Sequence, residues 1–228
     1  MGSMVDFARP DGGKTKGFLA LADAGAGGEG PSVIVIQEWW GLNDQICGVA
    51  DRFARAGYNA LAPDLYEGRV TQEPDEANHM MSGLDFPGAT HQDIRGAALH
   101  LQDLAPNGGG KVAVMGFCMG GALTIAAAVH VPEISVGVCF YGIPPAEFAD
   151  PANISLPLQC HFANQDDWCT PAAVDELEAT LTAAGANAEI HRYDAAHGFF
   201  NETSEAAYDA TSANLAWRRM SEFLAANQ

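Results

Sequence analysis

The stretch that decides the fold is "GFCMGG", residues 116–121, which lies between "KVAVM" (111–115) and "ALTIAAAVH" (122–130). The first run has the apolar character of a buried strand, and the second has the alanine-rich composition of a helix. Between them, Gly116 and Gly120 flank Cys118 in a G-x-C-x-G spacing. The sequence therefore predicts an abrupt strand-to-helix turn with a thiol at its apex.

The two glycines have a steric reason in such a turn. Its apical residue takes a strained backbone conformation, and side chains two residues to either side would collide with the neighbouring strand and helix. The geometry would lift the Cys118 thiol to the start of a helix, where free N–H groups and the helix dipole favour a thiolate. The alternative for so short a motif is a buried structural cysteine beside helix-packing glycines.

Strand and helix patterns alternate on both sides of this turn. Strands are expected in six runs and helices in five, with the last helix inside 204–226. The strand runs are 32–37, 58–65, 111–117, 136–142, 157–163 and 188–194, and the other helical runs are 43–57, 91–105, 119–130 and 171–185. This alternation predicts one α/β domain over residues 1–228, a mostly parallel twisted sheet with helices on both faces.

Two connections attract notice. Residues 67–90 are polar, contain two prolines and are longer than most connections, so a partly helical excursion near the functional site is expected. The glycine-rich residues 23–31 are expected to form a surface hairpin loop.

The ends of the first helical run, residues 43–57, also show in the sequence. Asn43 or Asp44 would cap its start, and Gly57 would end it.

The chain is strongly acidic. It has 11 Lys plus Arg against 29 Asp plus Glu, a formal charge of −18, which repels nucleic acid backbones and anionic membranes. No stretch approaches the roughly 18 apolar residues of a spanning helix, and the first residues lack the basic and apolar parts of a signal peptide. We therefore expect a cytoplasmic protein, a monomer or a homodimer, without nucleic acid or membrane partners.

The five cysteines do not suggest a disulfide framework or a zinc site. Their number is odd and no pair shows C-x-x-C spacing. They are Cys47, Cys118, Cys139, Cys160 and Cys169. Reduced thiols are expected, with no metal and no cofactor.

A thiol nucleophile needs a base and an acid that orients the base. Of the four histidines after Cys118, His197 follows a strand end and precedes a glycine, as a base on a loop should. His161 and His191 fall within strand patterns, and His130 ends a helix.

The acid should follow the preceding strand, where "ANQDDWCTP" (163–171) supplies Asp166 and Asp167. The alternative for this acidic pair is a solvated turn, or a cap for the helix that opens at Pro171.

Five motifs together resemble the dienelactone hydrolase family of the α/β-hydrolase superfamily. They are "QEWWG" (37–41), "APDLYEG" (62–68), "GFCMGG", "NQDDWCTP" (164–171) and "AAHGFF" (195–200). The resemblance implies an α/β-hydrolase fold and a triad of Cys118, Asp167 and His197. Asp167 is preferred to Asp166 because the family acid usually stands four residues before the proline that opens the next helix, here Pro171.

The resemblance also assigns residues around the thiol. Glu38 would pair with the thiol in the resting state, and a buried glutamate in an apolar run would otherwise be costly. The backbone N–H groups of Trp39 and Met119 would form an oxyanion hole.

The substrate is expected to be neutral. Family members that bind an anionic lactone use two arginines, but here one position is Asn201 and only Arg69 lies near the other. Aromatic residues on loops around the expected pocket favour aryl or hydrophobic esters or lactones, with neutral phosphotriesters as secondary substrates. These residues are Trp39, Trp40, Tyr66, Phe86, Trp168, Phe199 and Phe200. The alternatives are a dienelactone hydrolase acting on an anionic lactone, and a noncatalytic protein that binds a small ligand.

Overall fold

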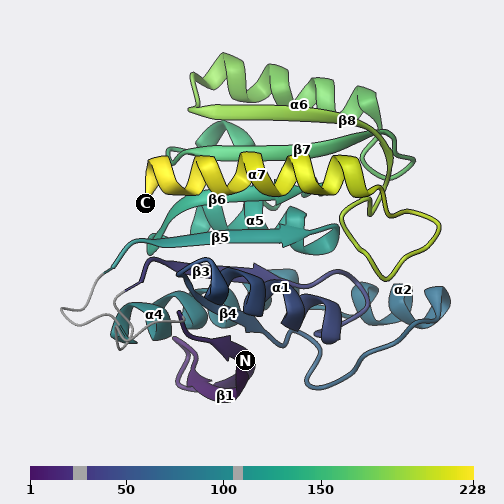
Figure 1. Cartoon of the computed structure of the whole chain (residues 1–228). Helices are drawn as coiled ribbons and strands as arrows, with labels where there is room; N and C mark the ends of the chain where they lie inside the picture. The colour runs from purple at the N-terminus through teal and green to yellow at the C-terminus, as the bar shows by residue number, and fades with distance from the viewer. Residues whose placement is uncertain (23–29, 105–109) are drawn as a thin grey trace.

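The computed structural model describes residues 1–22, 30–104 and 110–228. Eight strands form one sheet in the order β1-β2-β4-β3-β5-β6-β7-β8 (Figure 1). The strands are β1 (Ser3–Ala8), β2 (Lys14–Ala20), β3 (Ser32–Ile36), β4 (Asn59–Pro63), β5 (Val112–Phe117), β6 (Ile134–Phe140), β7 (Leu158–Gln165) and β8 (Ala188–Ala196). Strands β3 to β8 pair in parallel, which confirms the expected mostly parallel sheet.

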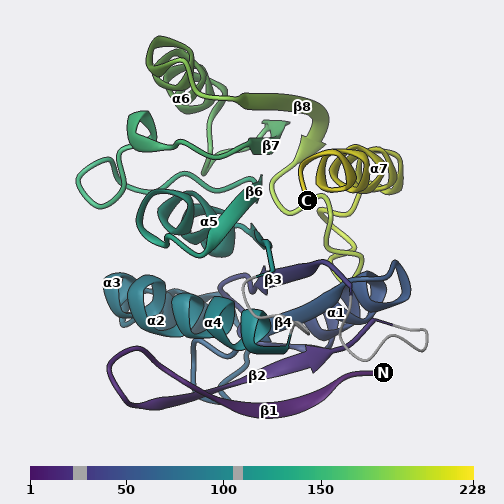
Figure 2. The same ribbon diagram turned by 90° about the vertical axis from the view of Figure 1, so that its left-hand side faces the viewer.

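Helices cover both faces of the sheet, as predicted. Figure 2 shows α1 and α7 on one face, with α4, α5 and α6 on the other. The helices are α1 (Asp44–Arg55), α2 (Pro74–Ser82), α3 (Phe86–Gly88), α4 (Arg95–Leu104), α5 (Met119–His130), α6 (Pro171–Ala184) and α7 (Ala210–Asn227), with a π-helical segment η1 (Ala89–Ile94) and a short 3₁₀ turn η2 (Pro151–Asn153). The arrangement is that of an α/β-hydrolase fold.

Two strands at the start of the chain were not expected from the sequence. Strand β1 pairs antiparallel with β2, and β2 pairs antiparallel with β4. In β1 only Phe7 is buried, so the strand lacks the apolar run by which the other strands were recognised. This hairpin extends the sheet at the edge away from β8.

Local sequence explains where several helices begin and end. The Asn43 side chain caps α1 by accepting a hydrogen bond from the Ile46 N–H at 3.1 Å, which selects Asn43 from the two expected caps. Gly57 follows α1 with a φ of 92°, and Gly185 follows α6 with a φ of 68°, conformations that glycine adopts without strain.

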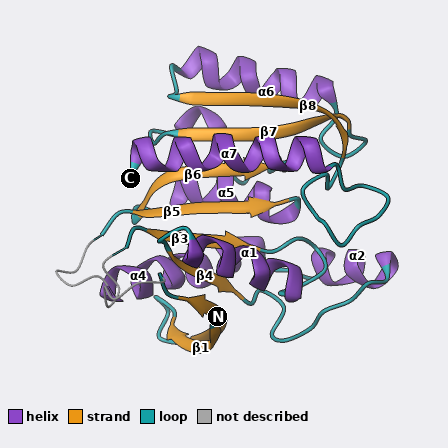
Figure 3. Cartoon of the chain, viewed as in Figure 1, coloured by secondary structure: helices purple, strands orange, loops and turns teal. Residues whose placement is uncertain are grey.

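Of the two connections singled out from the sequence, residues 67–90 are described by the structure and most of residues 23–31 are not. The excursion over 67–90 contains α2 and α3, as predicted, and it reaches beyond the carboxyl ends of the parallel strands (Figure 3). The helix expected over 91–105 begins inside η1, and Ala105 lies outside the described residues, as does most of the expected loop at 23–31. In the described ranges no helix combines the length and hydropathy needed to cross a membrane.

Candidate active site

Cys118 occupies the strained apex that the sequence predicted. It lies between β5 and α5 with φ 55° and ψ −117°, an uncommon conformation for a residue other than glycine. A Cβ at Gly116 would overlap the Gly120 carbonyl, and a Cβ at Gly120 would lie 2.5 Å from the Gln37 carbonyl oxygen. Both glycines are therefore required for β3, β5 and α5 to approach one another around the thiol.

A third glycine completes this turn and was not singled out from the sequence. Gly142 follows β6, and a Cβ there would overlap the Cys118 carbonyl oxygen and the Ala122 nitrogen. The Cys118 N–H donates to the Phe140 carbonyl at 3.0 Å. The end of β6 thus holds the backbone of the turn from the side opposite β3.

Several groups act on the charge of the Cys118 thiol. Burial raises its pKa, while the interactions with His197 and with the Met119 N–H lower it, and the nearby Glu38 carboxylate raises it. The thiol is thus protonated at rest unless a cation forms beside it. The N–H of Met119 is directed at the sulfur, as a donor at the start of a helix should be.

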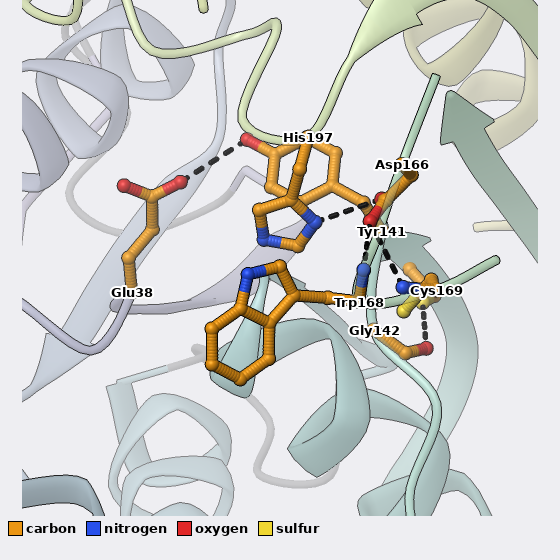
Figure 4. Close-up of polar contacts among 8 residues, drawn as sticks. Glu38, Tyr141, Gly142, Asp166, Trp168, Cys169 and His197 are labelled. Atoms are coloured by element: carbon orange, nitrogen blue, oxygen red, sulfur yellow. Dashed lines mark hydrogen bonds and ion pairs between the residues drawn. The ribbon is translucent and has the colours of Figure 1, made fainter. Parts of the chain in front are cut away.

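His197 is oriented by Asp166. Its Nδ1 lies 2.8 Å from Asp166 Oδ2, and the Asp166 side chain is completely buried (Figure 4). Burial alone would lower the pKa of His197, but the bond to Asp166 and the interaction with Cys118 raise it to about 10. Burial would raise the pKa of Asp166, yet His197 and two backbone N–H groups lower it overall. Because the Cys118 contribution comes from its thiolate, this arrangement stabilises the imidazolium that forms, beside the Asp166 carboxylate, when the thiol gives up its proton.

The expectation that Asp167 orients His197 is wrong. Asp166 Oδ1 accepts hydrogen bonds from the N–H groups of Trp168 at 2.7 Å and Cys169 at 2.9 Å, which turns the loop back over this carboxylate. The adjacent Asp167 is consequently turned outward and exposed. Neither aspartate caps α6, because Thr170 accepts from the Ala173 N–H at 3.3 Å.

Glu38 is buried beside the thiol, but its hydrogen bonds go elsewhere. Oε1 accepts from the Tyr141 hydroxyl at 3.2 Å, and Oε2 accepts from Asn201 Nδ2 at 2.8 Å. The expected resting pair between Glu38 and the thiol is therefore replaced by two neutral donors. Burial raises the pKa of Glu38, with Asn201 and His197 opposing that shift.

Tyr141 is a site residue that sequence reasoning missed. Its φ of 37° places it in a strained region directly after β6, and its ring lies edge-on to His197 with 5.0 Å between centroids. Figure 4 shows it between Glu38 and the Asp166–His197 pair. The only available signal was its position at a strand end before Gly142.

The other three histidines after Cys118 are structural. His161 is fully buried and bonds the Tyr193 hydroxyl at 2.8 Å and Gln159 Oε1 at 2.9 Å. His191 Nε2 lies 3.5 Å from Glu189 Oε2 on the same strand, β8, and His130 contacts the Phe148 carbonyl at 2.7 Å. His197 is thus the histidine that the structure brings to the thiol.

A cavity of about 330 Å³ opens above Cys118 and His197. Six predicted residues line it together with them: Glu38, Trp39, Trp40, Phe86, Met119 and Trp168. Met81, Ile143, Pro145 and Ala207 add apolar surface that sequence reasoning did not identify. No Lys or Arg is among the lining residues in the described part of the chain, and Arg69 is exposed and donates to the Tyr66 carbonyl at 3.4 Å.

Three aromatic residues expected in the pocket are core residues instead. The Tyr66 hydroxyl contacts the Met119 sulfur at 3.2 Å beneath the site. Phe199 is fully buried, and Phe200 stacks on Phe117 with 5.0 Å between centroids. Both phenylalanines anchor the loop that carries His197 and have no surface to offer a ligand.

The arrangement carries no metal-binding cluster: among the described residues, no three His, Cys, Asp or Glu side chains are placed to hold an ion. All five cysteines are free, as expected. His197 Nε2 is buried and has no hydrogen-bond partner within the described ranges. A nitrogen in that state beside a buried thiol is placed to accept and return a proton.

Comparisons with known proteins find similarity over almost the whole chain. The model of the dienelactone hydrolase family matches residues 16–227. Protein usf of Aquifex pyrophilus is 34% identical over 224 residues, and an Aquifex aeolicus protein provisionally named carboxymethylenebutenolidase is 29% identical, each match covering 95% of both chains.

Solved structures resemble this chain over almost their whole length. A provisionally named dienelactone hydrolase from Klebsiella pneumoniae superposes with a TM-score of 0.81 and 26% identity over 99% of both chains. The dienelactone hydrolase-like promiscuous phosphotriesterase P91 from metagenomic libraries gives a TM-score of 0.80 at 22% identity, covering 99% of this chain and 98% of P91.

Proposed function

Because this chain belongs to the dienelactone hydrolase family, and is a hydrolase of esters or lactones, we propose that it cleaves neutral aryl esters or lactones with a Cys118–His197–Asp166 triad. The observation that carries the proposal is the 2.8 Å contact between His197 Nδ1 and Asp166 Oδ2, which leaves Nε2 free beside the thiol. Glu38, Trp39 and Met119 line the same cavity.

Acylation begins with transfer of the Cys118 proton to His197 Nε2. The thiolate attacks the ester carbonyl, and the Trp39 and Met119 N–H groups stabilise the resulting oxyanion; one such donor contributes about 3 kcal/mol in other hydrolases. The tetrahedral intermediate collapses to a thioester and expels the alcohol oxygen. That oxygen takes the proton from Nε2.

Deacylation repeats the sequence with water. His197 Nε2 removes a proton from the water, whose oxygen attacks the thioester carbonyl. Collapse breaks the carbon–sulfur bond, releases the carboxylic acid and returns the proton to sulfur. Asp166 stabilises the imidazolium in both halves, because its carboxylate stays bound to Nδ1.

The walls of the cavity support the proposal of a neutral substrate. A carboxylate would lose its water there without a cationic partner, which costs several kcal/mol. The buried Glu38 and the net charge of −18 oppose it further. An apolar ester avoids these costs and gains about 25 cal/mol per Å² of apolar surface buried.

The charge preference is tested with a neutral and a carboxylate-bearing ester that share one leaving group. We expect kcat/KM to favour the neutral ester at least about tenfold, which corresponds to roughly 1.4 kcal/mol. Added salt should narrow the difference without removing it, since screening acts on the encounter more than on the buried pocket. If the anionic ester reached the kcat/KM of the neutral ester, the result would favour the alternative, an anionic lactone as substrate.

Neutral phosphotriesters are proposed as secondary substrates. Support comes from the absence of Lys and Arg among the described residues that line the cavity, from the buried thiol, and from the activity in the name of P91, whose fold this chain shares. The thiolate would attack phosphorus and expel an aryl alcohol, and water activated by His197 would then have to break the sulfur–phosphorus bond. Release of more than one aryl alcohol per thiol from a diethyl aryl phosphate indicates turnover, and release of one indicates trapping.

A further inference from the structure

The two ends of the proposed ester must occupy different parts of the cavity, because His197 protonates only one of them. Its Nδ1 is bound to Asp166, so the leaving oxygen has to lie beside Nε2. The group attached to that oxygen must therefore extend over residues close to the His197 ring. This step rests on the proposed function.

Two aromatic rings contact His197 in the described part of the chain. Tyr141 is 1% exposed and its hydroxyl is bound to Glu38, so it offers almost no surface. Trp168 is 62% exposed, lines the cavity and lies with its ring 6.4 Å from that of His197. Figure 4 shows the indole beside the imidazole. An exposed indole in this position offers an apolar surface on which a group of the substrate can pack.

The indole is also held in a defined position. The backbone N–H of Trp168 donates to Asp166 Oδ1 at 2.7 Å, while the other oxygen of that carboxylate is bound to His197 Nδ1. The ring lies edge-on to Trp39 at 5.6 Å, and Trp39 lies edge-on to Trp40 at 5.0 Å. One carboxylate thus fixes the proton donor and the aromatic surface relative to each other.

The opposite wall comes from another part of the sheet. Met81 and Phe86 belong to the excursion after β4, whereas Trp168 follows β7, and β5 with Cys118 lies between these strands. Figure 1 shows α2 and the loop after β7 on opposite sides of the end of β5. We propose that Trp168 is the specificity-determining surface for an aryl leaving group, and that Met81 and Phe86 contact the acyl group.

The test compares two esters that carry the phenyl ring on opposite sides of the scissile bond. In phenyl acetate the ring is on the leaving group, and in trifluoroethyl phenylacetate it is on the acyl group. We expect Trp168→Ala to lower kcat/KM for phenyl acetate about tenfold and for the other ester less than about twofold, with Trp168→Phe restoring most of the loss. Phe86→Ala is the matched control and should show the reverse preference.

A second measurement is based on binding of a product. Phenol, the product that would occupy the leaving-group site, should inhibit competitively, and Trp168→Ala should raise its inhibition constant about tenfold. Trp168→Ala should also weaken the binding of phenol about tenfold when it is introduced into the inactive Cys118→Ala protein, where binding is measured by tryptophan fluorescence. Equal losses on both esters, or an unchanged affinity for phenol, would overturn the assignment of Trp168 while leaving the esterase intact. A Cys118→Ala protein that still turns over phenyl acetate would instead contradict the proposed function.

Discussion

Two segments at the carboxyl edge of the sheet carry the candidate triad, and they differ in how tightly the local backbone is constrained. The elbow, residues 116–121, turns so sharply that Gly116 and Gly120 cannot carry a Cβ. The acid loop, residues 164–170, places Asp166 at 3% exposure and leaves Asp167 in solvent. The conformation of the elbow could be predicted because steric exclusion allows only glycine at two of its positions. The role of each aspartate in the acid loop depended on which carboxylate accepts hydrogen bonds from three donors in the folded chain.

The difference shows that a motif is most informative where only one residue type fits. At the elbow, any other side chain would overlap neighbouring backbone atoms, so the glycine spacing identifies the apex. In the acid loop both neighbours are aspartates and both could follow the strand. The choice came from the Trp168 and Cys169 N–H groups and from His197, a partner 31 positions away.

The largest expected effect is at the elbow. Cys118→Ala should reduce kcat by roughly 10⁶, as loss of a nucleophile does in a serine triad, while the chain still folds. Esterase kinetics with phenyl acetate measure the loss, and circular dichroism checks the fold. Cys47→Ala is the matched control and should retain activity, because this thiol lies on α1 away from the cavity. A Cys118→Ala protein with near-normal kcat/KM would show that the apex does not carry the nucleophile.

The next effect separates the two aspartates. Asp166→Asn should lower kcat by about 10⁴, because an amide cannot stabilise the imidazolium and favours the wrong tautomer. Asp167→Asn should change kcat less than about threefold, since its side chain is exposed. Steady-state kinetics on one neutral ester decide the comparison. Equal losses in the two variants would mean that the loop rearranges during the reaction.

The steric argument at the elbow can be tested without activity. Gly120→Ala should destabilise the fold by at least about 2 kcal/mol, because the new Cβ would lie 2.5 Å from the Gln37 oxygen and 2.6 Å from the Ile36 oxygen. Gly48→Ala in α1 is the control, since no atom lies within 4 Å of its Cβ position, and it should stabilise by about 0.5 to 1 kcal/mol. Urea unfolding measures both, and similar stabilities would contradict the close approach of α5 to β3.

The smallest effect concerns pH. The pKa of His197 is raised to about 10 in the folded chain, above its ordinary 6.5, so its stabilising contribution is complete below pH 6.5 and is lost as pH rises toward 10. The lowered pKa of Asp166 gives a contribution that is present above its ordinary value of 3.8 and is lost as pH falls further.

Asp166→Asn should therefore destabilise most between pH 4 and 6.5, by about 2 kcal/mol, and progressively less toward pH 10. Thermal unfolding of both proteins at acidic, neutral and alkaline pH gives the difference. A difference that grows with rising pH would mean that His197 is not stabilised as a cation by this pair.

The parallel sheet, the elbow, His197 and the position of the acid within one residue could be predicted from the sequence. The hairpin of β1 and β2 could not, because β1 is largely exposed and the place of β2 in the sheet depends on its pairing with β4. The pocket was predicted in part: Trp40, Phe86 and Trp168 line the cavity, whereas Tyr66, Phe199 and Phe200 pack beneath it. Aromatic residues are common both in cores and in pockets, so the residue type alone does not show whether such a side chain lies in the core or lines the cavity.

What the sequence by itself determined were the features set by local sterics and by hydrophobic periodicity, namely the alternating strands and helices, the glycine-flanked Cys118 and the ends of α1. Only the tertiary structure decided which side chains meet: Asp166 instead of Asp167 at His197, and Tyr141 with Asn201 at Glu38. The physical reason is that a hydrogen bond requires two groups within about 3 Å. Residues 31 to 163 positions apart reach that distance only when the sheet brings their strand ends together.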